Sequence, residues 1–117
     1  MILRASERVQ TPEMNVRGGV GPAVSASYLK PGDMDNVVKA GRTCLEPGSS
    51  IGLHAHPTTE EFWFILEGHG TVLMDGEPFP VSAGDLMLTK AGHSHSLIND
   101  SDAPLVYFGL LTNQVAQ

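Results

Sequence analysis

Short runs of aliphatic, β-branched and aromatic residues alternate along the chain with clusters of turn-forming residues. Thirteen glycines and eight prolines punctuate the sequence, and no window of a dozen residues shows helical spacing free of both residue types. The pattern predicts strands over residues 20–29, 37–45, 61–66, 71–74, 85–89 and 105–111. Short strands separated by turns at such intervals are typical of an all-β sandwich or barrel.

Four dipeptides predict turns between these runs: Pro31-Gly32, Pro47-Gly48, Asp75-Gly76 and Ala83-Gly84. Asp75-Gly76 is the clearest hairpin, because a two-residue type I′ turn needs positive φ at both central residues. Pro78 and Pro80 follow it, and since proline donates no hydrogen bond to a ladder, we expect an irregular or edge strand there. A bend within residues 14–20 would join an N-terminal arm, residues 1–20, to the body of the protein.

Length and charge narrow the class of protein. A chain of 117 residues fits one domain, residues 1–117. Its formal net charge of −6 argues against nucleic acid and anionic lipid as partners. The charge is uneven: residues 1–42 sum to +2 and the rest to −8, so the basic part either is an ordinary solvated face or packs on an acidic one. Cys44 is the only cysteine, which excludes an intrachain disulfide. No secretory or membrane-spanning segment stands out, which favours the cytoplasm.

Histidines carry the candidate chemistry. All five lie between positions 54 and 95, and four form the pairs His54/His56 and His93/His95. Residues two apart on a strand share a face, so His54 and His56 can present two imidazoles to one point. Glu61 follows after a short turn and shares its strand face with Trp63. Glu60 is the alternative carboxylate, but it points to the opposite face.

This combination of side chains suits a metal. A carboxylate buried beside imidazoles is costly unless it is paired or bound to a cation. Three neutral imidazoles plus one carboxylate match a divalent transition metal: Mn, Fe, Co, Ni, Cu or Zn. Four protein ligands on an octahedral ion leave two positions open, whereas a tetrahedral zinc site with the same ligands is closed and structural.

Two longer motifs resemble those of the cupin superfamily. The first is Gly48-x5-His54-x-His56-x4-Glu61-x6-Gly68, and the second is Gly84-x5-Lys90-x-Gly92-x2-His95-x3-Asn99. They span residues 48–99, and two linked motifs are far more specific than one. Lys90 stands where the second motif usually has proline. The resemblance implies a double-stranded β-helix, or jelly-roll, barrel that holds one metal ion with His54, His56, Glu61 and His95.

The resemblance also bounds the function. It implies a metalloenzyme acting on a small carboxylate, hydroxy-keto or sugar-derived molecule by dioxygenase, decarboxylase, lyase or isomerase chemistry. The alternative is a non-catalytic module, a sensor or storage protein that binds a small molecule or metal at the same site. His93 is the candidate acid–base residue, and Trp63, Met74 and Met87 are candidates to line the pocket. Small cupins are often homodimers, and an N-terminal arm is compatible with that.

Overall fold

The computed structural model describes residues 1–113. These residues form ten strands and two short 3₁₀ helices. The elements are η1 (Ala5–Glu7), β1 (Thr11–Met14), η2 (Val16–Gly18), β2 (Pro22–Leu29), β3 (Val37–Leu45), β4 (Ser50–Ala55), β5 (Thr59–Glu67), β6 (His69–Met74), β7 (Glu77–Ser82), β8 (Leu86–Thr89), β9 (Ser94–Ile98) and β10 (Leu105–Asn113).

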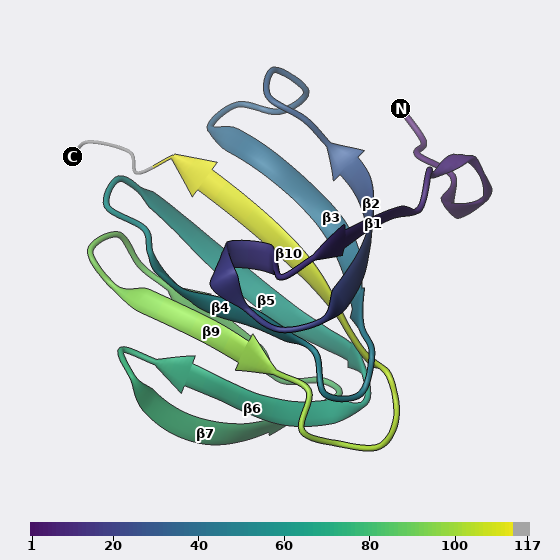
Figure 1. Ribbon diagram of the computed structural model, residues 1–117. Helices are drawn as coiled ribbons and strands as arrows, with labels where there is room; N and C mark the ends of the chain where they lie inside the picture. Colours follow the sequence, from purple (N-terminus) through teal and green to yellow (C-terminus); the bar gives the residue numbers. More distant parts are fainter. Residues whose placement is uncertain (114–117) are drawn as a thin grey trace.

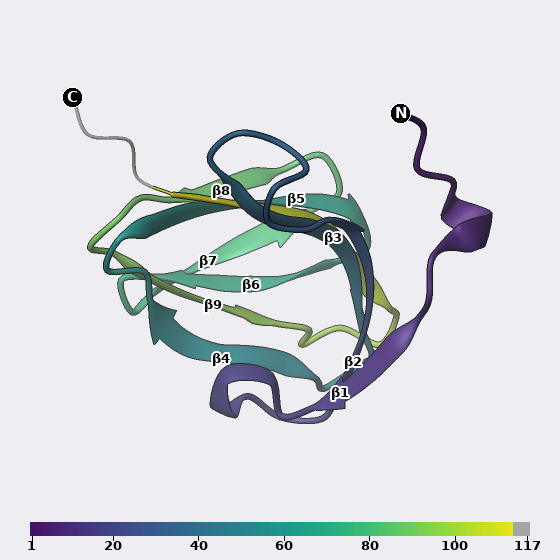
Figure 2. The ribbon, with the colours of Figure 1, turned by 90° about the horizontal axis from the view of Figure 1, so that it is seen from above.

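The strands form two antiparallel sheets. One has six strands in the order β1-β2-β3-β10-β5-β8, and the other has four in the order β4-β9-β6-β7. Figure 1 shows the four-stranded sheet packed across the larger one, and Figure 2, seen from above, shows the strands enclosing a common interior. The prediction of an all-β fold is confirmed.

The sequence pattern located most of the strands. All six predicted runs are strands, with ends shifted by a few residues. Asp75 and Gly76 both have positive φ, 51° and 83°, and join β6 to β7 as a two-residue hairpin. The proline-containing β7 is an edge strand, as expected. Four strands lie outside these runs. β7 was expected from its prolines and β4 was assumed in pairing His54 with His56, whereas β1 and β9 were not predicted. β9 has the sequence Ser-His-Ser-Leu-Ile. Its first three residues are polar, so the hydrophobic pattern did not predict a strand, yet His95 and Ser96 are buried.

The core lies between the sheets and fixes which residues face inward. Trp63 and Ile65 of β5 are buried at 2% and 0% exposure, and Glu61 shares their face by alternation. Met87 belongs to the same cluster of buried residues, and Met74 packs against it. Burial of each large apolar side chain stabilises the fold by roughly 1.5–3 kcal/mol, which helps to offset the cost of placing polar groups in the same interior.

The N-terminal residues form a bend that is pressed onto the barrel. β1 pairs with β2 at the edge of the six-stranded sheet, and the chain then turns sharply through η2, which lies against β4 (Figure 2). Two glycines allow this contact. A Cβ on Gly52 would collide with the carbonyl oxygen of Arg17, and a Cβ on Gly19 would collide with that of Ser50. Backbone packs directly on backbone here.

Candidate metal centre

Four side-chain atoms converge on one point inside the barrel. The Nε2 atom of His95 lies 3.0 Å from Nε2 of His54 and 2.8 Å from Nε2 of His56. Oε1 of Glu61 lies 3.1 Å from Nε2 of His95 and 3.4 Å from Nε2 of His56. One ligand atom from each of the four residues lies within 4.8 Å of all the others. These are the four residues that the resemblance assigned to a metal.

Strands from both sheets deliver these atoms. His54 on β4 is directly opposite His95 on β9 in the four-stranded sheet. His56 follows the end of β4, and its N–H donates to the carbonyl of His93 at 3.1 Å. Glu61 comes from β5 in the other sheet. Because the ligands bridge the two sheets, the cluster depends on the closed fold and not on any single hairpin.

Each imidazole is oriented through its other ring nitrogen. Nδ1 of His54 donates to the carbonyl of Gly52 at 2.7 Å, while Nδ1 of His56 and Nδ1 of His95 each contact a threonine hydroxyl. Those distances are 3.0 Å to Thr59 and 2.9 Å to Thr89. The Trp63 indole stacks on the His95 ring, with centroids 3.7 Å apart and planes 7° from parallel. Such outer contacts fix the tautomer and direction of a metal-binding histidine.

Proton counting shows that hydrogen bonds alone do not explain the cluster. A carbonyl only accepts, so the hydrogen of a neutral His54 is on Nδ1 and its Nε2 bears a lone pair. Nε2 of His95 faces two imidazole nitrogens and a carboxylate oxygen, yet it carries at most one hydrogen. A single cation satisfies all four atoms at once. Ligands at 2.0–2.1 Å from an ion and at right angles to one another are about 3 Å apart, so the four residues fit a divalent transition metal.

Electrostatics favour the ligand form of the histidines. Burial is the largest effect and lowers the pKa of His54 and His56, an effect that the charges of His95 and Arg17 reinforce and that of Glu61 opposes. Both imidazoles therefore stay neutral, and able to coordinate, at neutral pH. His95 is fully buried, and only 11% of the Glu61 side chain is exposed.

The cluster opens onto a small cavity. A space of about 70 Å³ is lined by three of the four candidate ligands, His54, His56 and Glu61, and by Val16, Arg17, Lys39, Ile51, Trp63, Tyr107 and Leu111. A second space of about 160 Å³ adjoins it, with Lys39, Glu61 and Tyr107 common to both linings. Burial raises the pKa of Tyr107 far above its ordinary value, so the phenol stays protonated and can donate a hydrogen bond.

The other predicted site residues have different outcomes. Trp63 lines the 70 Å³ cavity, but Met74 and Met87 do not. The structure does not bring His93 to the cluster: its side chain is 57% exposed, and Nδ1 lies 2.7 Å from a carboxylate oxygen of Asp75. An acid–base role for His93 stays a prediction that this geometry does not support. Lys90 is exposed, and its carbonyl accepts from the His93 N–H at 3.1 Å, so the loop closes without the usual proline.

Sequence reasoning missed the two cations of this cavity, Arg17 and Lys39. Their only signal was the concentration of basic residues before position 43, which did not indicate which of them face the site. It also missed Thr59 and Thr89. Thr59 lies three residues after His56, and Thr89 lies six residues before His95. Neither spacing is a known motif, because each contact depends on how the chain folds back between the two residues.

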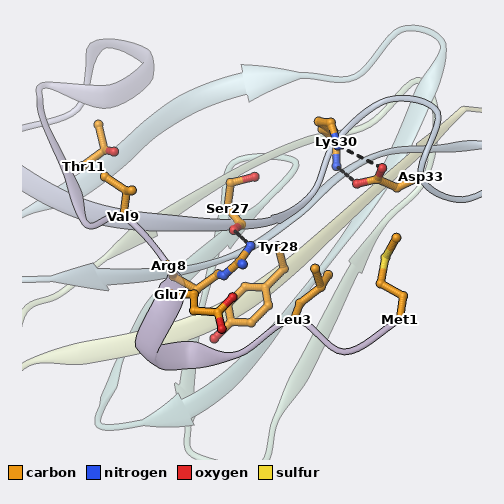
Figure 3. Close-up of a pocket in the computed structure, with 10 residues that line it drawn as sticks. All are labelled: Met1, Leu3, Glu7, Arg8, Val9, Thr11, Ser27, Tyr28, Lys30 and Asp33. Atoms are coloured by element: carbon orange, nitrogen blue, oxygen red, sulfur yellow. Dashed lines mark hydrogen bonds and ion pairs between the residues drawn. The ribbon is translucent and has the colours of Figure 1, made fainter.

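A larger cavity lies elsewhere, under the N-terminal arm (Figure 3). It encloses about 340 Å³ between residues 1–11 and the end of β2. The Arg8 guanidinium donates to the Ser27 carbonyl at 3.3 Å and lies over the Tyr28 ring, while Lys30 pairs with Asp33. None of its lining residues is buried, and no cluster of metal-ligating groups lies there among residues 1–113. The larger of these cavities is therefore not the one that lies beside the cluster of candidate ligands.

Comparisons with known proteins identify the family of this chain. A family model described as a cupin domain matches residues 41–111. An oxalate-binding protein of Thermotoga maritima is 36% identical over 112 residues, which cover 95% of this chain and 93% of that protein. A gentisate 1,2-dioxygenase of a Ralstonia species is 38% identical over 72 residues, covering 61% of this chain but only 20% of the dioxygenase.

Solved structures show the same fold. A crystal structure described as a predicted oxalate decarboxylase of Thermotoga maritima superposes with a TM-score of 0.93 at 34% identity, over 97% of this chain and 99% of that one. KdgF of a Halomonas species gives a TM-score of 0.79 at 14% identity, over 98% and 94% of the two chains. No helix among residues 1–113 is long and apolar enough to cross a bilayer. The jelly-roll prediction is confirmed, and the chain belongs to the cupin family.

Proposed function

We propose that this protein binds one divalent transition metal ion with His54, His56, Glu61 and His95 and, through that ion, binds a small carboxylate of the oxalate class. The observation that carries the proposal is the convergence of three imidazole nitrogens and one carboxylate oxygen beside an open cavity. A closed, four-coordinate structural site would need no such space. The metal, when bound, supplies a Lewis acid with coordination positions free for an oxygen ligand.

The size and lining of the cavity support a small polar ligand. One buried water needs on the order of 10–15 Å³ of such space, so 70 Å³ accommodates a molecule of only several non-hydrogen atoms. Trp63 and Ile51 supply apolar walls, and Tyr107 supplies a buried hydroxyl. The relative of similar length is described as an oxalate-binding protein, which supports oxalate as the first ligand to test.

Enzymatic turnover is the second candidate function. The similarity of part of the chain to a gentisate 1,2-dioxygenase favours it. Among residues 1–113, the cavity lining adds only Tyr107 and Lys39 to the candidate ligands as possible general acids or bases. Because Lys39 is exposed, we place ligand binding first. A homodimer and a cytoplasmic location stay predictions from the sequence.

The test combines metal analysis with calorimetry. Protein loaded with Mn²⁺ should hold about one ion per chain and bind oxalate, whereas the metal-free protein should not bind oxalate. Glu61→Gln should lose most of both activities, and Glu60→Gln, the matched neighbour on the other face of β5, should keep both. Oxalate binding without metal, or none with it, would contradict the proposal. Oxygen uptake or release of carbon dioxide from oxalate would establish turnover.

A further inference from the structure

The turn that contains η2 has a strained backbone and packs against β4. Asn15 and Arg17 both have positive φ, 55° and 54°, although neither is glycine. Left-handed backbone is uncommon for such residues and persists only where the surroundings impose it. Here the surroundings are two hydrogen bonds with β4, at 2.9 Å from Val20 N–H to the Ser50 hydroxyl and at 2.8 Å from Ser50 N–H to the Val20 carbonyl.

This turn places Arg17 at the cavity beside the cluster. Arg17 lines the same cavity as His54 and Glu61, and Lys39 of β3 lines it from the six-stranded sheet. Among residues 1–113, neither Arg17 nor Lys39 makes an ion pair or a side-chain hydrogen bond within the protein. Two exposed cations without a partner among the described residues therefore line one small cavity of a protein whose net charge is −6.

We propose that Arg17, assisted by Lys39, determines specificity at this site by binding the second carboxylate of a small dicarboxylate whose first carboxylate is held at the metal. This rests on the proposed function and adds the residues that select the ligand: with Arg17 and Lys39 in place, dianions are preferred to monoanions. Arginine suits the role because its planar guanidinium binds a carboxylate through two parallel hydrogen bonds.

Charge balance supports a dianion. A divalent ion with the Glu61 carboxylate leaves one positive charge at the cluster, and Arg17 and Lys39 add two more. A monocarboxylate at the metal would neutralise only the charge at the cluster, and Arg17 and Lys39 would both stay unpaired. A dicarboxylate places its second charge in the cavity that the two exposed cations line, so that one ligand can pair with the metal and with Arg17. The protein as a whole is acidic, so these two cations make the cavity a local region of positive charge.

Calorimetric titration of the Mn²⁺-loaded protein with oxalate and with formate tests the inference. Arg17→Ala should weaken oxalate binding about tenfold or more, with much less effect on formate and no loss of Mn²⁺. Arg17→Gly should behave in the same way, although glycine accepts the backbone conformation without strain, and Arg17→Lys should restore part of the affinity. Arg42→Ala is the matched control, because Arg42 lies on the opposite face of β3 from Thr43 of the cavity lining.

The outcomes separate this inference from the proposed function. If the wild type binds Mn²⁺ but not oxalate, both fail. If the wild type binds oxalate and Arg17→Ala binds it equally well, only the specificity role fails. An equal loss for oxalate and formate would assign Arg17 to general attraction of anions and overturn the preference for dianions. A loss of oxalate binding in Arg17→Ala that Arg17→Gly recovers would assign the effect to the backbone turn.

Discussion

The two cavities of this protein differ in the way their walls are made. The larger, under the N-terminal arm, is lined by exposed or half-buried side chains from one edge of the molecule. The smaller is lined by strands of both sheets and by the η2 turn, and several of its residues are held in place by a second layer of contacts. We expect function at the smaller cavity because, among residues 1–113, candidate metal-ligating groups converge only there, with directions fixed by further contacts.

The difference has a physical cause. At the arm, Arg8, Lys30 and Asp33 can each be solvated by water when their contacts break, so those contacts are worth little. At the cluster, His95 and its partners are removed from water, and each unsatisfied group there would carry a desolvation cost. Removing one member of the cluster should therefore cost more stability than breaking a contact at the arm.

Replacing His95 should have the largest effect. His95→Ala removes the one ligand that contacts the other three, so it should abolish measurable Mn²⁺ or Zn²⁺ binding. A metal at 100 times its dissociation constant stabilises the wild type by about 2.7 kcal/mol, and this metal-dependent shift of the melting curve should disappear. His95→Gln preserves more of the side-chain volume beside Trp63, and exposed His69→Ala is the control. A normal metal shift in both His95 variants would remove His95 from the ligand set.

Acidification should have the next largest effect. The pKa of His54 and His56 is lowered by burial in the folded protein, whereas the unfolded chain takes up protons near pH 6.5. Below that pH the unfolded state binds more protons, so the metal-free protein should lose stability as the pH falls from about 6.5 through the folded pKa values. Metal should dissociate over the same pH range. Its affinity should fall by up to about tenfold per pH unit for each imidazole that becomes protonated.

The measurement is a series of urea unfolding curves of the metal-free protein between pH 7.5 and 5. His56→Gln should flatten the pH dependence, and His69→Gln, which changes an exposed histidine, should leave it as in the wild type. Stability that rises on acidification would contradict the lowered pKa values.

Thr89→Val should have a moderate effect. The hydroxyl of Thr89 contacts Nδ1 of His95 at 2.9 Å, and valine keeps the shape but removes this contact. Loss of such a supporting contact typically lowers metal affinity by roughly 10–100-fold. Metal competition with a coloured chelator would measure it, and Thr71→Val, which breaks the exposed contact with Asp100, is the matched control. Equal metal affinity in the two variants would show that the His95 ring is oriented by the Trp63 stack alone.

The sequence predicted which residues form the His/Glu cluster better than it predicted the surroundings of that cluster, for reasons visible in particular residues. His54, His56 and Glu61 follow from strand parity and from the distance to Gly68, which are local properties. Arg17 and Lys39 reach the site only because two glycines let one turn lie on β4 and because β3 closes against β10. Such contacts between distant segments leave no periodic signal. β9 was missed for a related reason, since Ser94, His95 and Ser96 are polar residues in an inward strand.

Two lysines give the smallest and most direct contrast between the cavities. Both are exposed. Lys30 lies at the arm and pairs with Asp33 at 3.1 Å, whereas Lys39 lines the cavity beside the cluster without a partner among residues 1–113. Lys30→Ala should leave the melting temperature, the metal content and the oxalate affinity unchanged, whereas Lys39→Ala should weaken oxalate binding several-fold at low salt. Both variants change the net charge equally, so a matching loss in the two would indicate long-range attraction. Only a loss confined to Lys39→Ala assigns the charge to the site.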